Sequence, residues 1–164
     1  MKNIITTLIL LFSISVYSQE DEYGLQETVY QTALGAMIEN GNGVSLYGPQ
    51  IKQFLGDFGA VNGQILFGKH LFNIGADFTL NYQLLWFRDL SWYFGGGAQL
   101  SFMKNEDAAS FALRPLAGIE YKPKKYPIVV NAEIKPWWSF GEYKEFELMR
   151  FGFGVKYVLN RDIW

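Results

Sequence analysis

Polar and apolar residues alternate along the last long stretch of the chain, from Leu148 to Leu159. Every odd position from Met149 to Leu159 is apolar, whereas the even positions from 150 to 156 are arginine, glycine, glycine and lysine. A period of two residues is typical of a β-strand with one apolar and one polar face. Because the polar face combines charge with glycine, it suits a crowded polar interior. The pattern therefore predicts a transmembrane β-barrel strand with lipid outside and a polar lumen inside.

The stretch from Phe72 to Trp86 shows the same alternation over a longer range. Its even positions are apolar, and its odd positions from 73 to 83 are asparagine, glycine, aspartate, threonine, asparagine and glutamine. A polar row of this length is costly to bury without hydrogen-bond partners, and the apolar row is too long for a solvated sheet edge. A bilayer on one face and a hydrogen-bonded lumen on the other satisfies both rows. The alternative is a soluble, lipocalin-like carrier, in which the apolar row would face inward.

Eight strands of this kind fit between the turn signals of the chain. We expect them at about 29–38, 44–54, 60–68, 72–86, 92–102, 111–121, 127–140 and 148–159. The first should place Tyr30, Leu34, Ala36 and Ile38 on one face, and Asn-Gly pairs within 39–43 favour a hairpin turn after it. The predicted fold is an all-β, eight-stranded, antiparallel, up-and-down transmembrane β-barrel with short turns. An even number of strands puts both ends of the barrel chain on the periplasmic side.

Seven charged residues fall on inward positions of these strands. They are Asp77, Arg114, Glu120, Glu133, Lys135, Arg150 and Lys156. With three acids and four bases, the charges nearly balance, as they would in a salt-bridged plug of the lumen. The alternative is that these residues form a proton or ion path. An eight-stranded barrel is only wide enough for side chains to fill its interior, which favours the plug.

Two prolines, Pro115 and Pro136, fall on lipid-facing positions of the sixth and seventh strands. Proline has no N–H for the ladder and is normally confined to edges or bulges, yet a closed barrel has no edge. Each proline can lie at a bulge or a non-bonding position. Alternatively, the pair marks a lateral opening through which an acyl chain could enter. Such an opening would resemble the lateral gaps of the lipid A palmitoyltransferase barrels. The His, Asp and Ser catalytic set of those enzymes has no convincing match in this sequence.

The start of the chain has the features of a secretory signal peptide. Met1-Lys2-Asn3 precedes the apolar run Ile4 to Val16, and a small residue, Ser18, stands at the expected cleavage position. The expected organisation is a signal peptide over 1–18 and a polar lead-in over 19–27. The barrel would then occupy 28–160, with a C-terminal tail over 161–164.

Composition narrows the chemistry further. Aromatic residues make up 18% of the chain, more than is usual in a soluble domain of this size. The net charge of −2 gives no indication of the basic surface that binds nucleic acid. Without cysteine and with His70 as its one histidine, the chain offers no metal-ligand cluster, and we expect neither a metal nor a cofactor. A histidine in a short turn is more often solvated than catalytic, so we expect no enzyme activity, although lipid modification stays open.

On these patterns the chain resembles the small eight-stranded outer-membrane β-barrel proteins of Gram-negative bacteria. In the last strand, Arg150, Gly152, Val155 and Tyr157 have the spacing of the signal that the barrel-assembly machinery reads, although residues 160–163 intervene before the terminal Trp164. The resemblance implies an outer-membrane location, with membrane lipid and the assembly machinery as partners, and a monomeric state. Members of this fold serve as anchors, adhesins, conduits or lipid-modifying enzymes, so fold does not choose the function. We expect a structural or envelope role, or a narrow conduit, with a lipid-binding barrel open near Pro115 and Pro136 as an alternative.

Overall fold

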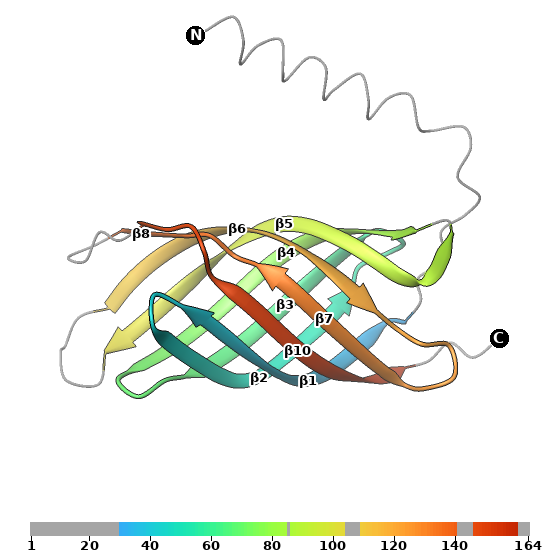
Figure 1. Ribbon diagram of the computed structural model, residues 1–164, viewed down its shortest axis with the longest axis horizontal. Helices are drawn as coiled ribbons and strands as arrows, with labels where there is room; N and C mark the ends of the chain where they lie inside the picture. Colours follow the sequence, from blue (N-terminus) through green and yellow to red (C-terminus); the bar gives the residue numbers. More distant parts are fainter. Residues whose placement is uncertain (1–29, 85, 104–108, 141–145, 161–164) are drawn as a thin grey trace, which may run out of the picture.

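The structure is a computed structural model that describes residues 30–84, 86–103, 109–140 and 146–160 (Figure 1). This part of the chain folds into ten β-strand segments. They are β1 (Thr32–Gly41), β2 (Val44–Phe54), β3 (Gly59–Phe67), β4 (Leu71–Leu84), β5 (Phe87–Met103), β6 (Ala109–Tyr121), β7 (Ile128–Ile134), β8 (Trp137–Phe140), β9 (Phe146–Glu147) and β10 (Phe151–Asn160). The expected signal peptide, lead-in and tail lie outside the described residues.

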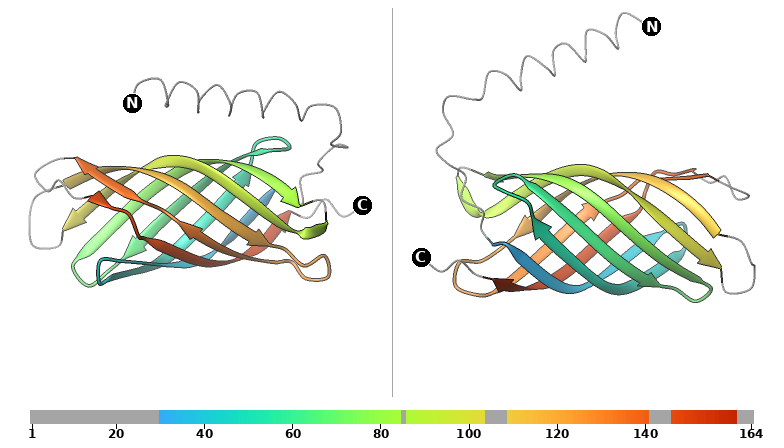
Figure 2. Two further views of the ribbon diagram at one scale, coloured as in Figure 1. Left: turned by 45° about the horizontal axis from the view of Figure 1, so that its top comes forward. Right: turned by 180° about the vertical axis from the view of Figure 1, so that it is seen from behind.

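The strands close into an antiparallel barrel. Each strand from β1 to β6 pairs with the next, β7 and β8 both pair with β6, and β10 pairs with both β7 and β1. β7 and β8 together form one strand of the wall, and β9 and β10 together form another, so the pairings give a wall of eight strands. Figure 2 shows the barrel from two further sides. The predicted eight-stranded, up-and-down antiparallel fold is confirmed.

The tight hairpin between β1 and β2 turns on Asn42 and Gly43. Both residues have positive φ angles, 43° and 76°. Asparagine and glycine tolerate this left-handed region, and two such residues in succession match the twist of the strands they join. The predicted Asn-Gly turn is confirmed, although Glu39, which we expected in the turn, belongs to β1.

Alternation along β4 separates lipid-facing from lumen-facing residues. Ile74 and Phe78 are 43% and 49% exposed on the outside, whereas Asn73, Asp77 and Thr79 are at most 2% exposed on the inside. A soluble carrier requires the opposite arrangement, so the structure contradicts the lipocalin-like alternative. Large apolar side chains cover the exterior of the other strands as well, and patches of this extent are rare on soluble monomers.

The lumen has an apolar cluster towards each end and a polar centre. Met37, Leu46 and Leu66 pack together near the β1–β2 turn. At the opposite end, Tyr30 packs with Ala33, Val129 and Val158, with Phe54 against them. These clusters enclose the polar centre between them.

Three expectations about strand geometry were wrong in detail. The register between β1 and β10 shifts between Thr32 and Ala33. Because this irregularity inverts the alternation, Tyr30 points into the lumen, where it is 3% exposed, instead of sharing the outer face of Leu34. The seventh strand is interrupted between β7 and β8 at Pro136, and the closing strand is interrupted between β9 and β10 at residues 148–150.

Candidate functional site in the barrel lumen

The seven charged residues at inward positions all lie in the barrel interior. Six of them are only 2–3% exposed, namely Asp77, Arg114, Glu120, Lys135, Arg150 and Lys156. The side chain of Glu133 is 7% exposed. Buried charges at this depth require partners, because an isolated ion in a low-dielectric interior is strongly unfavourable.

Arg114 on β6 and Asp77 on β4 form a bidentate ion pair across the lumen. The guanidinium Nε donates to Asp77 Oδ1 at 2.9 Å, and Nη2 donates to Oδ2 at 2.8 Å. Arg114 Nη1 also donates to the side-chain oxygen of Gln99 on β5. Parallel fork contacts of this type combine strength with a fixed orientation. They hold β4, β5 and β6 together from the inside.

Lys135 joins several carboxylates. Its ammonium lies 2.6 Å from Glu133 Oε1 and 3.2 Å from Glu39 Oε1. It lies 3.7 Å from Asp77 Oδ2 and donates to Gln64 Oε1 at 2.8 Å. One cation therefore links residues of β1, β3, β4 and β7.

Arg150 joins the same group from the irregular segment between β9 and β10. Its Nε lies 3.3 Å from Glu39 Oε2, and its Nη1 lies 3.2 Å from Glu147 Oε2. The guanidinium also stacks over the Trp137 ring, with 4.4 Å to the centroid. Arg150 therefore anchors the part of the wall where the closing strand loses its regular pairing.

Glu120 on β6 organises the second half of the lumen. Its Oε1 accepts a hydrogen bond from the Tyr30 hydroxyl at 2.7 Å, and its Oε2 lies 3.1 Å from both Lys52 and Lys156. Lys52 further donates to Asn81 at 2.7 Å. The Glu120 carboxylate is thus a shared counter-ion for two lysines. Through Tyr30 it also links the segment before β1 to β6.

Tyr93 and Asn131 connect the two halves. The Tyr93 hydroxyl donates to Glu133 Oε2 at 2.8 Å and accepts from Asn131 Nδ2 at 3.4 Å. Asn131 Oδ1 in turn accepts from Lys156 at 3.0 Å. Because Glu133 also contacts Lys135, one continuous polar network runs along the lumen between the two apolar clusters.

The sequence-based set missed three charged residues of this network, Glu39, Lys52 and Glu147. All three are at most 5% exposed. They add two acids and one base, so the set becomes five acids and five bases. Glu39 shares the inward parity of Met37 on β1, and this parity was the signal that could have placed it in the lumen.

The wall between β6 and the β7–β8 segment is not continuously paired. Ladder pairs join Ala117 to Ile134 and Leu113 to Trp138, but none joins the residues between them. The register of both ladders places Pro115 opposite Pro136 in this gap. Pro115 is exposed and Pro136 half-buried. Behind the gap lie the buried Arg114 and Lys135 side chains.

Other candidate positions lie apart from this network. Val155 and Tyr157 face outward on β10 and Gly152 faces inward; with Arg150 they span the predicted assembly signal. His70 is exposed in the turn between β3 and β4. Within the described ranges, no group of three or more His, Cys, Asp or Glu side chains could hold a metal ion. The same residues contain no helix long and apolar enough to cross a membrane.

Comparisons with known proteins bear on the fold. No family model and no curated protein sequence matches the chain. The structure is similar to the N-terminal β-barrel domain of Pseudomonas aeruginosa OprF, with a TM-score of 0.64 and 17% identity over 77% of this chain and 95% of that chain. It is also similar to the de novo designed protein TMB2.3, with a TM-score of 0.56 and 14% identity over 84% of this chain and 99% of that one. At these identities the likeness shows the fold, which is that of the eight-stranded outer-membrane β-barrels.

Proposed function

We propose that this chain is an integral outer-membrane protein whose side-chain-filled lumen gives it a structural role in the envelope. The observation that carries the proposal is the continuous network from Glu120 through Asn131, Tyr93 and Glu133 to Lys135. Side chains linked in this way hold the strands at fixed distances and occupy the path that ions would use. A water-filled porin channel requires a much wider barrel.

The exterior supports a membrane location. Ile74, Phe78, Phe153 and Val155 are 43% to 57% exposed at outward positions of β4 and β10. Such surfaces are stable next to hydrocarbon and unfavourable in water. Tyrosine and tryptophan near the strand ends, such as Tyr82 and Trp92 with ring centroids 5.1 Å apart, fit the headgroup region.

Two measurements test this function together. The full chain, expressed in a Gram-negative host, should stay in the membrane fraction after a carbonate wash and float with lipid vesicles. The purified protein in a planar bilayer should show no porin-like conductance. Recovery as a soluble protein would refute the membrane location, and steady large conductance from the monomer would refute the filled lumen.

A second candidate function is lipid binding through a lateral opening, and the interrupted ladder at Pro115 and Pro136 favours it. Trp137 is next to this gap and belongs to an inward position of β8, so its fluorescence can report on acyl chains that enter. In a variant that retains only Trp137, lipids brominated on their acyl chains should quench it more strongly than in the same variant carrying Pro115→Val and Pro136→Val. A variant that retains only the outward Trp138 serves as the control. Equal quenching of Trp137 with and without the prolines would reject lateral entry.

A further inference from the structure

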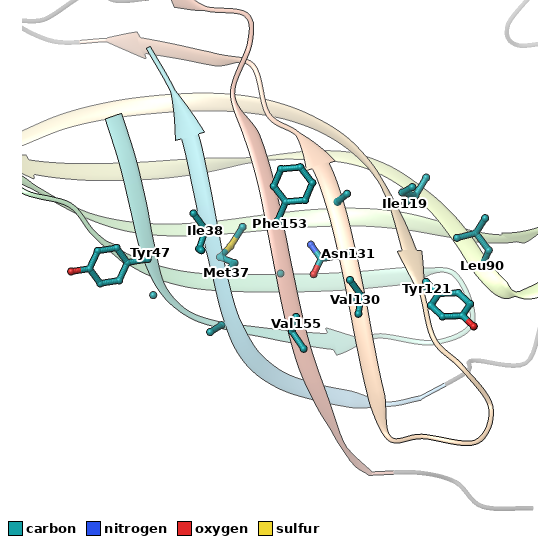
Figure 3. A pocket seen from close by; sticks show the side chains of 14 residues that line it. Met37, Ile38, Tyr47, Leu90, Ile119, Tyr121, Val130, Asn131, Phe153 and Val155 are labelled. Carbon is teal, nitrogen blue, oxygen red and sulfur yellow. The ribbon is translucent and has the colours of Figure 1, made fainter. Parts of the chain in front are cut away.

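An apolar groove crosses the outside of the barrel over β2, β1, β10, β7 and β6 (Figure 3). Its volume is about 580 Å³. The groove lies on the lipid-facing side of the wall, and Asn131, whose side chain belongs to the polar network of the lumen, is among its lining residues. None of the features described above accounts for it.

Two rows of outward side chains bound the groove. One row runs from Tyr47 through Ile38 and Phe153 to Ala132, and each member is directly opposite the next on the neighbouring strand. The second row runs in the same way from Ala36 through Val155 and Val130 to Tyr121. The rows are two residues apart along each strand, which is about 6.8 Å. The groove therefore runs across the strands, between the rows.

Small side chains make the groove deep. Ala36 and Ala132 lie in the rows beside large neighbours such as Phe153, Tyr47 and Tyr121. Only a methyl group projects where the flanking positions carry rings or branched chains. The result is a groove between taller side chains instead of an evenly covered surface.

The dimensions of the groove suit a single acyl chain. From Tyr47 to Tyr121 it crosses four strand spacings, about 19 Å. One leaflet contributes roughly half of the ~30 Å hydrocarbon core, so a groove of this length can hold a chain that spans a leaflet. Tyr47 is near the β1–β2 turn and Tyr121 is the last residue of β6, so the groove descends towards the periplasmic end of the barrel.

The periplasmic end of the groove carries positive charge. Tyr121 leads into the turn over 122–127, which contains three lysines and no acidic residue. Lys124 and Lys125 are exposed. Arg88 and Asp89 lie at the neighbouring start of β5, and their opposite charges cancel. Lysines at a membrane surface attract anionic headgroups. Figure 3 shows Tyr121 at the end of the groove that this turn follows.

We propose that this groove binds one acyl chain of an anionic phospholipid from the periplasmic leaflet, with its phosphate held at Lys124 and Lys125. The inference rests on the proposed membrane location and adds a lipid site to it. Apolar side chains supply the binding surface, and the lysines supply the headgroup preference. The site lies on the outer wall and is distinct from any entry at Pro115 and Pro136.

Native mass spectrometry of the full-length mature barrel, released from bilayers of equal amounts of phosphatidylglycerol and phosphatidylcholine, tests the site. We expect one retained phosphatidylglycerol per barrel. Ala132→Phe and Ala36→Phe fill the groove and should abolish retention. Ala76→Phe places the same ring on the outward face of β4, outside the groove, and should leave retention unchanged. Lys124→Gln with Lys125→Gln should lower the preference for the anionic lipid about thirtyfold, whereas Lys69→Gln in the opposite turn should not.

Folding and insertion are verified for each variant by heat-modifiable migration and vesicle flotation, so that a lost lipid is not confused with a lost fold. A chain that does not insert would overturn the proposed function. An inserted, folded barrel that retains no lipid, or retains it equally after Ala132→Phe and Ala36→Phe, would overturn the groove assignment alone. Release as a dimer that Ala132→Phe dissociates would instead assign the groove to a second copy and reject the lipid.

Discussion

Pro115 of β6 and Pro136, between β7 and β8, lie directly opposite each other in the barrel wall. The register that pairs Ala117 with Ile134 and Leu113 with Trp138 fixes this relationship. The Lys135 N–H donates to the Arg150 carbonyl on the other side, at 2.8 Å. Since N–H groups alternate between the two neighbours of a strand, position 136 faces β6, and opposite residues of this type exchange two hydrogen bonds. Neither bond can form, because both residues are prolines.

Restoring the missing donors tests this explanation of the gap. In a Pro115→Val, Pro136→Val double variant, the two new amides should be protected from hydrogen exchange. Each bond should add roughly 0.5–1.5 kcal/mol, offset by roughly 0.4–1 kcal/mol per position from the greater freedom of the unfolded chain. Net stability should therefore change little. Exchange as fast as in the turn over 122–127 would show that something other than the missing donors holds the strands apart.

Neutralising Glu120 should strongly destabilise the lumen. Glu120→Gln leaves Lys52 and Lys156 in the interior without their shared carboxylate, and removing one partner of a buried ion pair costs roughly 3–5 kcal/mol. Urea unfolding in lipid vesicles measures the loss. The exposed Asp57→Asn, in the β2–β3 turn, should stay within about 0.5 kcal/mol. A Glu120→Gln barrel as stable as the Asp57→Asn control would mean that solvent already compensates the two lysines.

The sequence predicted the fold well where the lumen is polar. In β4 and β10, inward polar residues and glycines alternate with outward apolar ones. This two-residue period predicts β-strands, and the polar inner face predicts a transmembrane barrel. Near its ends, however, the lumen is itself apolar, and inward positions carry residues such as Leu46. In β2 this inward leucine precedes the inward Gln50 and Lys52, so no uniform polar face marks the strand. Lys52 was missed for this reason.

The sequence pattern could not predict which residues lie opposite each other on neighbouring strands. Alternation gives the face of each residue but not its partner on the neighbouring strand. The opposition of Pro115 and Pro136 depends on the register between β6 and β7, and the shared contacts of Lys135 depend on closure of the barrel. Tyr30 shows a further limit, because the irregularity after it inverts its face and leaves no trace in the residue types.

Neighbouring glycines of β5 provide a matched test of the crowded interior. A Cβ at Gly97 would meet the Ala76 carbonyl and the Asp77 carboxylate, which holds Arg114, whereas a Cβ at the outward Gly96 meets nothing nearer than 3.5 Å. Gly97→Ala should therefore cost roughly 1–3 kcal/mol through overpacking. Gly96→Ala should be neutral or stabilising by up to about 1 kcal/mol. Denaturation curves of the two variants in the same vesicles give the comparison, and similar stabilities would contradict the tight interior.

Arginine substitutions at different depths test which residues face lipid. Ile134 and Leu80 lie at outward positions of β7 and β4, within the membrane-spanning part of the wall. Ile134→Arg and Leu80→Arg should each destabilise the barrel by about 2–4 kcal/mol if they lie at mid-bilayer. Trp86 is 95% exposed in the turn between β4 and β5. Trp86→Arg should cost only about 0–1 kcal/mol, since charges near the interface remain hydrated. Unfolding in vesicles measures all three, and the order of the costs decides the outcome. Equal costs at the three positions would be incompatible with a hydrocarbon layer around β4 and β7, and would remove the physical basis for the membrane-spanning barrel.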